Sequence, residues 1–397
     1  MPRSSPIASL VERVRSADST FRIGAGVALL SLIVMWLADR LQATVLYHVF
    51  GMIAASVIIW FACDPFAEAA QWLGKRLHLP GSIRGATLDA IASSMPELFV
   101  GVLFVAEFQD FGASVATCAG SAMYNMALIP AACAIAISFG ARGRSALQVT
   151  REVIVRDGLW FIAAEIFLVY CLFERRIEVW SAIALLALYI AYLIHLWRHA
   201  ATHRREKKRA AAAAANESEQ DDDTPDHVRV FGGVFSPKLG WATCILTLLV
   251  STLVVGAVSH SLVVACEQIS ESIGVPSFLV AVIVVAAASS VPDTLLSIGA
   301  ARRGDDAGAV SNAFGSNTFD VTICLSVPVL IHAIRYGGDL KLEHDAAVAP
   351  LGLLLVALSI VTLLVMRWRY AIDRGKAVLL IALYLIFVAF AILSAMA

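Results

Sequence analysis

Residues 92–97 read Ala-Ser-Ser-Met-Pro-Glu, and residues 288–293 repeat this arrangement as Ala-Ser-Ser-Val-Pro-Asp. A second related pair follows: residues 120–125 read Gly-Ser-Ala-Met-Tyr-Asn, and residues 315–320 read Gly-Ser-Asn-Thr-Phe-Asp. In the first copy Glu97 precedes Asn125 by 28 residues, and in the second copy Asp293 precedes Asp320 by 27 residues. Matched patterns at matched spacing indicate an internal duplication with an offset of about 196 residues.

The chain is too apolar for an ordinary soluble protein. Of its 397 residues, 59% are hydrophobic and 15% are charged, and the mean hydropathy is +0.79, whereas soluble proteins carry about 25% charged residues. A helix needs about 20 apolar residues to cross a bilayer core of about 30 Å. Such stretches lie near residues 22–38, 43–63, 83–107, 111–138, 154–173, 177–197, 239–264, 277–301, 307–334, 346–366 and 377–396. We therefore expect an all-α polytopic membrane protein with about 11 transmembrane helices.

Composition also excludes several kinds of site. The net charge is −1, and no basic patch is interleaved with aromatic residues, so we expect no nucleic-acid partner. The seven cysteines are scattered singly, without CxxC spacing, which indicates neither a thiolate metal site nor a disulfide framework. We interpret them as small apolar packing residues. No cofactor is expected, and no oligomer is required.

The distribution of basic residues predicts the orientation. If the N-terminus is cytoplasmic, 25 Lys and Arg residues fall on the inner side and five on the outer side, namely Arg40, Arg175, Arg176, Arg335 and Lys341. Cytoplasmic loops of membrane proteins carry such an excess. One missing span would exchange the inner and outer sides for all Lys and Arg residues that follow it. We expect an integral multi-pass protein of the plasma (cell inner) membrane with a cytoplasmic N-terminus.

The order of the spans predicts an inverted repeat. Five crossings separate the opening helix of the first copy from that of the second, so the two copies have opposite orientations. Inverted-topology repeats place a substrate site near the membrane midplane, between two halves. The predicted organisation is 5+5 helices plus one extra N-terminal helix. Its segments are a cytoplasmic N-terminal segment 1–21, the extra helix 22–38, a first transmembrane half 43–198 with its repeat at 83–138, a cytoplasmic linker 199–236, and a second half 237–397 with its repeat at 277–334.

The linker 199–236 contains blocks of like charge. A basic run at residues 204–209 is followed by six alanines and then by an acidic run through residues 221–226. This composition predicts a solvated segment, helical at its basic end and otherwise flexible. The acidic run lacks the spacing of an EF-hand, so it does not indicate a regulatory calcium site.

We call residues 92–97 the first hexad and residues 288–293 the second hexad. The first hexad carries oxygen donors on one helix face. Ser93 and Glu97 are four residues apart, and Ser94 and Glu97 are three apart. Pro96 has no N–H, so the carbonyl of Ala92 loses its helical partner and the local turn loosens. A carbonyl freed inside a membrane needs another partner, and a bound cation is one.

The other three stretches offer equivalent donors. These candidate ligands are Ser289, Ser290, Asp293, Ser121, Asn125, Ser316 and Asp320. All are oxygen donors, which hard cations such as calcium and sodium prefer, whereas zinc or copper favours imidazole or thiolate. A charge at mid-bilayer costs at least ~2.5–3.5 kcal/mol. Calcium, or several sodium ions, would compensate the three carboxylates. The glycines at 120 and 315 are expected to let their helices approach neighbours closely.

Other interpretations remain open for these and two further acids. The carboxylates could form buried ion pairs, although the motifs contain no Lys or Arg, or they could be protonated. Asn125 could form a hydrogen bond that only bridges helices, and the hydroxyls of Ser94, Ser121, Ser290 and Ser316 could simply cap backbone groups. Asp89 lies two turns to the cytoplasmic side of Glu97 and could line an access path or carry a proton. Glu165 lies in mid-span without a motif, where polar packing and transport are both open.

These motifs resemble the α-repeats of the sodium/calcium exchangers, within the cation/calcium antiporter superfamily, and are closest to the potassium-dependent branch. The resemblance covers residues 83–138 and 277–334. It implies that Glu97 and Asp293 bind calcium, together with Ser93 and Ser289, and that Asn125 and Asp320 complete the central site. It also implies that the neighbouring serines line sodium sites: Ser94, Ser290, Ser121 and Ser316. The family usually has Gly-Thr-Ser where this chain has Ala-Ser-Ser, which leaves ion selectivity open.

We therefore expect a secondary active antiporter, not an enzyme, that exchanges Ca²⁺ for Na⁺ by alternating access, with K⁺ dependence open. Its partners are inorganic cations and the lipid bilayer. The alternative on the same fold is H⁺-coupled exchange of Ca²⁺ or another divalent cation. A channel would show uncoupled flux. A membrane hydrolase would need a GxGD pair of aspartates or a Ser–His pair, and the sequence has neither.

Overall fold

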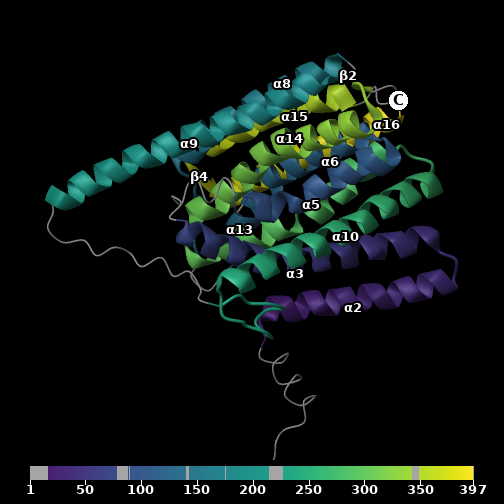
Figure 1. Ribbon diagram of the computed structural model, residues 1–397, viewed down its shortest axis with the longest axis horizontal. Coiled ribbons are helices and arrows are strands. Elements are labelled where there is room, and N and C mark those ends of the chain that lie inside the picture. The colour runs from purple at the N-terminus through teal and green to yellow at the C-terminus, as the bar shows by residue number, and fades with distance from the viewer. Residues whose placement is uncertain are drawn as a thin grey trace, which may run out of the picture.

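The fold is a bundle of long helices that lie side by side (Figure 1). The computed structural model describes residues 17–77, 88, 90–139, 143–174, 176–213, 227–341 and 348–396. The main helices are α2 (Ser19–Arg40), α3 (Thr44–Arg76), α5 (Ala90–Leu103), α6 (Phe111–Met123), α7 (Ile129–Ser138), α8 (Gly158–Phe173), α9 (Val179–Ala213), α10 (Trp241–Ile273), α11 (Ser277–Val280), α12 (Ala286–Ser289), α13 (Val291–Arg303), α14 (Asp306–Tyr336), α15 (Val348–Arg367) and α16 (Arg374–Met396). Four π-helical turns interrupt them: η2 (Phe104–Phe108), η3 (Tyr124–Leu128), η4 (Val153–Asp157) and η5 (Ala281–Val285).

The predicted all-α polytopic membrane architecture is confirmed. Within the described residues, nine helices are long and apolar enough to cross a membrane, and a bent pair, Ser277–Ser289 with Val291–Arg303, would make a tenth. The predicted fifth span coincides with η4 and α8. Because α8 has only 16 residues, it is shorter than the about 20 residues that a crossing helix needs. The total of eleven therefore stays a prediction.

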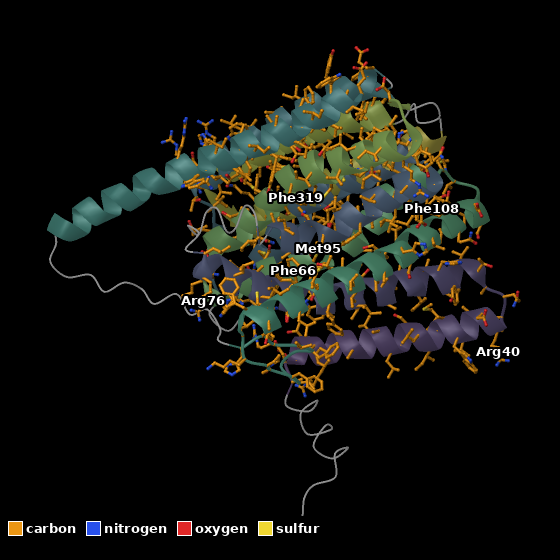
Figure 2. The ribbon with its side chains drawn as sticks, viewed as in Figure 1. Arg40, Phe66, Arg76, Met95, Phe108 and Phe319 are labelled. Carbon is orange, nitrogen blue, oxygen red and sulfur yellow. The ribbon has the colours of Figure 1, made fainter. Side chains whose placement is uncertain are left out.

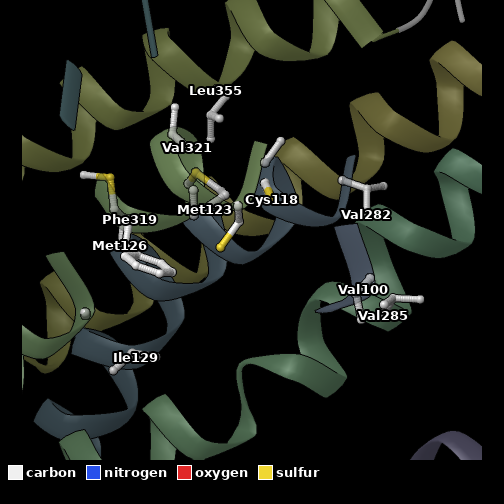
Figure 3. Packing of buried hydrophobic residues seen from close by; sticks show 14 of the residues in the cluster. Val100, Cys118, Met123, Met126, Ile129, Val282, Val285, Phe319, Val321 and Leu355 are labelled. Atoms are coloured by element: carbon white, nitrogen blue, oxygen red, sulfur yellow. The ribbon is translucent and has the colours of Figure 1, made fainter. Parts of the chain in front are cut away.

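Burial separates central helices from peripheral ones. The span Phe111–Ser138 is 72% buried, whereas α2 is 17% buried and lies at the edge of the bundle, next to α3 (Figure 1). Exposed apolar side chains such as Leu29 and Trp36 on α2 are suited to contact with lipid. Figure 2 shows Arg40 and Arg76, the last residues of α2 and α3, at opposite ends of the bundle. Most of the interior is filled by one large hydrophobic cluster, part of which is drawn in Figure 3, and a second, small cluster lies around Trp72 and Val228.

Two short sheets relate the halves of the chain. At one end, β1 (Ala146–Gln148) pairs with β4 (Ala371–Asp373), and at the other, β2 (Arg176–Ile177) pairs with β3 (Leu340–Lys341); Figure 1 shows β4 and β2 at opposite ends. The residue numbers of β3 and β4 exceed those of β1 and β2 by about 195. Each sheet thus joins a loop of one half to a loop of the other. This is the relation that an inverted repeat produces.

Helix caps and aromatic pairs follow the same offset. The Asp110 carboxylate accepts a hydrogen bond from the Ala113 N–H at 2.8 Å and begins α6, and Asp305 accepts from the Gly308 N–H at 2.8 Å and begins α14. The ring of Tyr124 meets that of Tyr384 edge-on.

The matching aromatic pair is Phe319 with Tyr189, whose rings also meet edge-on. Phe319 and Tyr384 follow Tyr124 and Tyr189 by about 195 positions. These equivalent contacts support the predicted inverted repeat.

The two hexads differ in backbone shape. In the second copy the helix breaks at Ser290, and α13 starts immediately afterwards with Pro292 in its first turn, so the two segments are bent by 42°. In the first copy α5 continues as a helix through Pro96. The turn that Pro96 was expected to loosen therefore does not break the helix of the first copy.

The structure describes two parts of the linker. The structure describes α9 as continuing through the basic run to Ala213, while the acidic run at 221–226 lies outside the described residues. Beyond it, two antiparallel bridges, His227 with Lys238 and Val230 with Phe235, form a hairpin. The Arg229 side chain donates to Glu68 of α3 at 2.7 Å, and this hydrogen bond raises the pKa of Arg229. The expectation of a flexible segment was therefore wrong for residues 227–236.

The two motif glycines have different environments. A Cβ on Gly120 would lie 2.2 Å from the Val282 carbonyl oxygen and 2.7 Å from the Ala286 Cβ, so α6 approaches η5 and α12 at a distance that only glycine permits. A Cβ on Gly315 would meet nothing within 4 Å. Close approach was predicted for both, and it is wrong for Gly315.

This difference gives a stability prediction. Gly120→Ala should lower the apparent melting temperature of the detergent-solubilised protein, because overpacking against a backbone carbonyl costs about 1–3 kcal/mol. Gly315→Ala is the matched control and should leave it unchanged or slightly raised, since Ala is favoured over Gly inside a helix by about 0.5–1 kcal/mol. Equal melting temperatures for the two variants would contradict the close approach at Gly120.

Candidate functional site

Three carboxylates from three helices meet in the centre of the bundle. Glu97 lies on α5, Asp293 on α13 and Asp320 on α14, and all three are fully buried. Two of these carboxylates, those of Glu97 and Asp320, lie close to the Ser121 hydroxyl of α6. Its Oγ lies 3.1 Å from Glu97 Oε1, 3.3 Å from Asp320 Oδ2 and 2.9 Å from the Ser290 Oγ.

Asn125 joins the third carboxylate to this group. Its Nδ2 lies 3.5 Å from Asp293 Oδ2, 3.3 Å from Ser316 Oγ and 3.5 Å from Ser121 Oγ. Asn125 belongs to the π-helical turn η3, and such turns are frequent at functional sites because they redirect side chains. The amide therefore connects residues of both copies.

The first serine of each hexad contacts the carboxylate of the acid in the hexad of the other copy. Ser93 interacts with the Asp293 carboxylate, and Ser289 interacts with the Glu97 carboxylate. Both hydroxyls also lie near a carbonyl of their own helix, Ser93 with Ala90 and Ser289 with Ala286. Each of these two hydroxyls therefore lies between a carbonyl of its own helix and a carboxylate of the other copy.

All ten predicted residues are buried at this place. Ser94 lies beside Asp320, and Ser316 contacts both Asn125 and the Asn312 carbonyl oxygen, at 3.3 and 3.0 Å. Gly120 contributes indirectly: its close approach to η5 and α12 brings the adjacent Ser121 to Ser290. The structure brings the set together, and the role of each residue as an ion ligand stays a prediction.

No basic side chain among the described residues forms an ion pair with the three acids. In the described part of the chain, the arginine ion pairs lie elsewhere, at Asp306, Asp157 and Glu68, and none involves the three acids. The ion-pair interpretation is therefore not seen here. Glu97 Oε2 and Asn125 Oδ1 are buried acceptor oxygens without a hydrogen-bond partner among the described residues. Buried unpaired acceptors are costly and rare, and a hard cation would satisfy both.

The donor set is mixed. Across the described residues, no three His, Cys, Asp or Glu side chains converge closely enough to hold a metal ion by themselves. An ion bound here would be held by carboxylate, hydroxyl and amide oxygens together. Calcium and sodium accept this combination, since both are hard cations.

Cysteine packing agrees with the sequence interpretation, with one addition. All seven cysteines are buried and free. Cys324 lies at the edge of the site, where its Sγ is 3.8 Å from Asp320 Oδ1 and 3.7 Å from the Ser94 carbonyl oxygen. Sequence spacing gave no sign of this placement, although Cys324 follows Asp320 by one helical turn.

Sequence reasoning also missed Asn312. Its Nδ2 lies 3.0 Å from Asp293 Oδ1 and 3.3 Å from Ser297 Oγ. The signal was present, because Asn312 precedes Ser316 by four residues and so shares its helix face.

The two acids whose role the sequence left open have different outcomes. Asp89 is outside the described residues. Glu165 on α8 is fully buried and accepts a hydrogen bond from Ser359 of α15 at 2.8 Å. This contact provides the polar neighbour that the packing interpretation requires.

Comparison with known proteins links the sequence to one family. The sequence profile described as "Sodium/calcium exchanger protein" matches residues 47–198 and 243–393. A human protein named sodium/potassium/calcium exchanger 4 is 34% identical over 152 residues, which cover 37% of this chain and 24% of the human protein. The match thus spans about a quarter of that relative.

Two solved structures share the fold. The crystal structure of an H⁺/Ca²⁺ exchanger, CAX, superposes with a TM-score of 0.62 at 16% identity and covers 94% of this chain and 92% of its own. A structure of the sodium-calcium exchanger NCX_Mj superposes with a TM-score of 0.54 at 20% identity and covers 87% and 99%. At these identities the likeness concerns the fold.

Proposed function

The chain belongs to the sodium/calcium exchanger protein family, and on that premise we propose that it is a secondary active antiporter that exchanges Ca²⁺ for Na⁺ across a membrane. The observation that carries the proposal is the group of three buried carboxylates with no basic partner among the described residues. Such a group is costly in a bilayer unless cations compensate it. The names of the relatives agree with this chemistry.

The proposed ligands are the ten predicted residues. Ca²⁺ takes 6–8 oxygen ligands at about 2.3–2.6 Å. Glu97 Oε2 and Asn125 Oδ1 offer free acceptors, and the hydroxyls around Ser121 supply further oxygens. Several Na⁺ ions would compensate the same carboxylates, so the two cations would compete for one site. That competition is the basis of exchange.

Alternating access follows from the inverted repeat. The two halves make equivalent contacts at opposite ends of the bundle, so a rearrangement that closes one end and opens the other converts each half into the conformation of its partner. The ligand-bearing helices α5, α6, α13 and α14 contact one another centrally. They would remain around the ion while the access path changes sides.

We further propose that the protein resides in the plasma (cell inner) membrane with a cytoplasmic N-terminus. The distribution of 25 basic residues inside and five outside supports this orientation. The division into two transmembrane halves, 43–198 and 237–397, with the linker 199–236 inside, forms part of the same proposal.

The driving ion has one alternative. Serines replace the usual threonines in both hexads, which changes the space around the ion and favours testing H⁺ as the coupling ion. K⁺ dependence is a second variable, since the human relative carries potassium in its name.

An ion-substitution flux experiment tests the exchange. Vesicles containing the purified protein and loaded with ⁴⁵Ca²⁺ should release it when a Na⁺ gradient is imposed, and external choline should not replace Na⁺. Separate K⁺ additions and pH steps measure the other couplings. Release driven by a pH step in Na⁺-free buffer, without release by Na⁺, would establish the alternative and reject the Na⁺ proposal.

A substitution tests the site. Asp293→Asn should lower Na⁺-driven Ca²⁺ flux by about 100-fold or more, since losing a charge that compensates a buried ion costs about 3–5 kcal/mol. Asp305→Asn is the matched control: Asp305 caps α14 outside the site, and Asn caps equally well, so its flux should equal wild type. Wild-type flux in the Asp293 variant, with normal expression, would remove Asp293 from the site.

A further inference from the structure

Asn312 joins two ligand-bearing helices at the site. From α14 it reaches α13, where its Nδ2 donates to Asp293 Oδ1 at 3.0 Å and lies 3.3 Å from Ser297 Oγ. Its own carbonyl oxygen accepts a hydrogen bond from Ser316 Oγ at 3.0 Å. One residue thus orients a carboxylate of one helix and a hydroxyl of the next.

The repeat lacks this contact in its first copy. Thr117 precedes Gly120 by three residues, as Asn312 precedes Gly315, so the two positions are equivalent. Among the described residues, the Thr117 hydroxyl donates a hydrogen bond to the Ala113 carbonyl of its own helix, at 2.9 Å. In the described part of the chain, Glu97, the acid of the first copy, therefore receives no equivalent amide. Its Oε2 has no partner among the described residues.

The two acids are consequently presented in different ways. Asp293 Oδ1 is held by the Asn312 amide, and Asp293 Oδ2 is directed to Asn125, 3.5 Å away. Glu97 keeps one oxygen free. Hydrogen bonds to a carboxylate fix its orientation and strengthen with its charge.

We propose that Asn312 is a positioning residue that holds the Asp293 carboxylate so that Oδ2 faces the transported ion, and thereby sets the Ca²⁺ affinity of the site. The inference rests on the proposed function, because it assigns Asp293 to the ion site. It adds a residue outside the matched motifs, and it makes the second half of the repeat the rigid side of the site.

The test compares Asn312→Ala with Thr117→Ala in vesicles. Asn312→Ala should raise the half-saturating Ca²⁺ concentration by about tenfold, since a hydrogen bond to a charged group is lost, while the maximal rate stays near wild type. Thr117→Ala removes a buried hydroxyl at the equivalent position and should leave both quantities unchanged. An unchanged half-saturation in Asn312→Ala, or an equal rise in Thr117→Ala, would overturn the proposal.

A binding readout separates this inference from the proposed exchange. Ca²⁺ added to the detergent-solubilised protein should raise its melting temperature, with a midpoint about tenfold higher in Asn312→Ala than in wild type. If wild-type vesicles show no Na⁺-driven flux but these midpoints still differ, the exchange fails and the positioning role stands. If Asn312→Ala does not fold, Asn312→Ser, which keeps a polar group but lacks the reach, replaces it. Coincident midpoints in the folded variant and wild type would reject the role.

Discussion

The structure depends on burying three carboxyl groups together, at a place where no basic side chain of the described residues pairs with them. Glu97, Asp293 and Asp320 are fully buried, and the hydroxyl of Ser121 lies within hydrogen-bond distance of two of them. Holding carboxylates this way is unfavourable in an apolar bundle unless cations enter. The surrounding serines and amides soften that cost by donating hydrogen bonds, and they also provide neutral oxygens. The feature that is costly without cations therefore supports the proposal that hard cations bind here.

The inverted repeat explains how one chain builds such a site from simple parts. Each copy supplies an acid and the serine that serves the acid of the other copy, so neither half forms the site alone. The equivalent helix caps, the two sheets and the aromatic pairs show the relation far from the centre as well. Function depends equally on where the symmetry fails. Asp320 occupies the position equivalent to Asn125, and Asn312 the position equivalent to Thr117. The helix breaks at Ser290 but not at Pro96. These differences give the two sides of the site different side chains and different backbone shapes.

Much of the fold and the site could be predicted from the sequence, because lipid restricts spanning segments to apolar helices and the duplicated motifs mark their own centre. All ten predicted ligands lie close together. Helical spacing accounts for neighbours on one helix, since it puts Ser93 and Ser94 on the face of Glu97. Other features depend on partners that spacing does not reveal. Gly315 shares its motif with Gly120 but faces open space. Asn312 lies one turn from Ser316, yet only the packing of α14 against α13 brings it to Asp293. Cys324 lies one turn from Asp320 on the same helix, but its contact with the Ser94 carbonyl depends on the packing of α14 against α5. The hairpin at the end of the linker is held by Glu68, which lies about 160 residues away in sequence.

The central claim is that Ca²⁺ and Na⁺ compete for one site among these oxygens. Anomalous diffraction tests it most directly. Crystals grown with Ca²⁺ and then with Sr²⁺ should show one strong anomalous peak within about 2.3–2.6 Å of Glu97 Oε2 and neighbouring site oxygens. That peak should fade when the crystals are transferred to high Na⁺. A peak elsewhere in the protein, or a Lys or Arg side chain occupying the space between Glu97 and Asp320, would contradict the account.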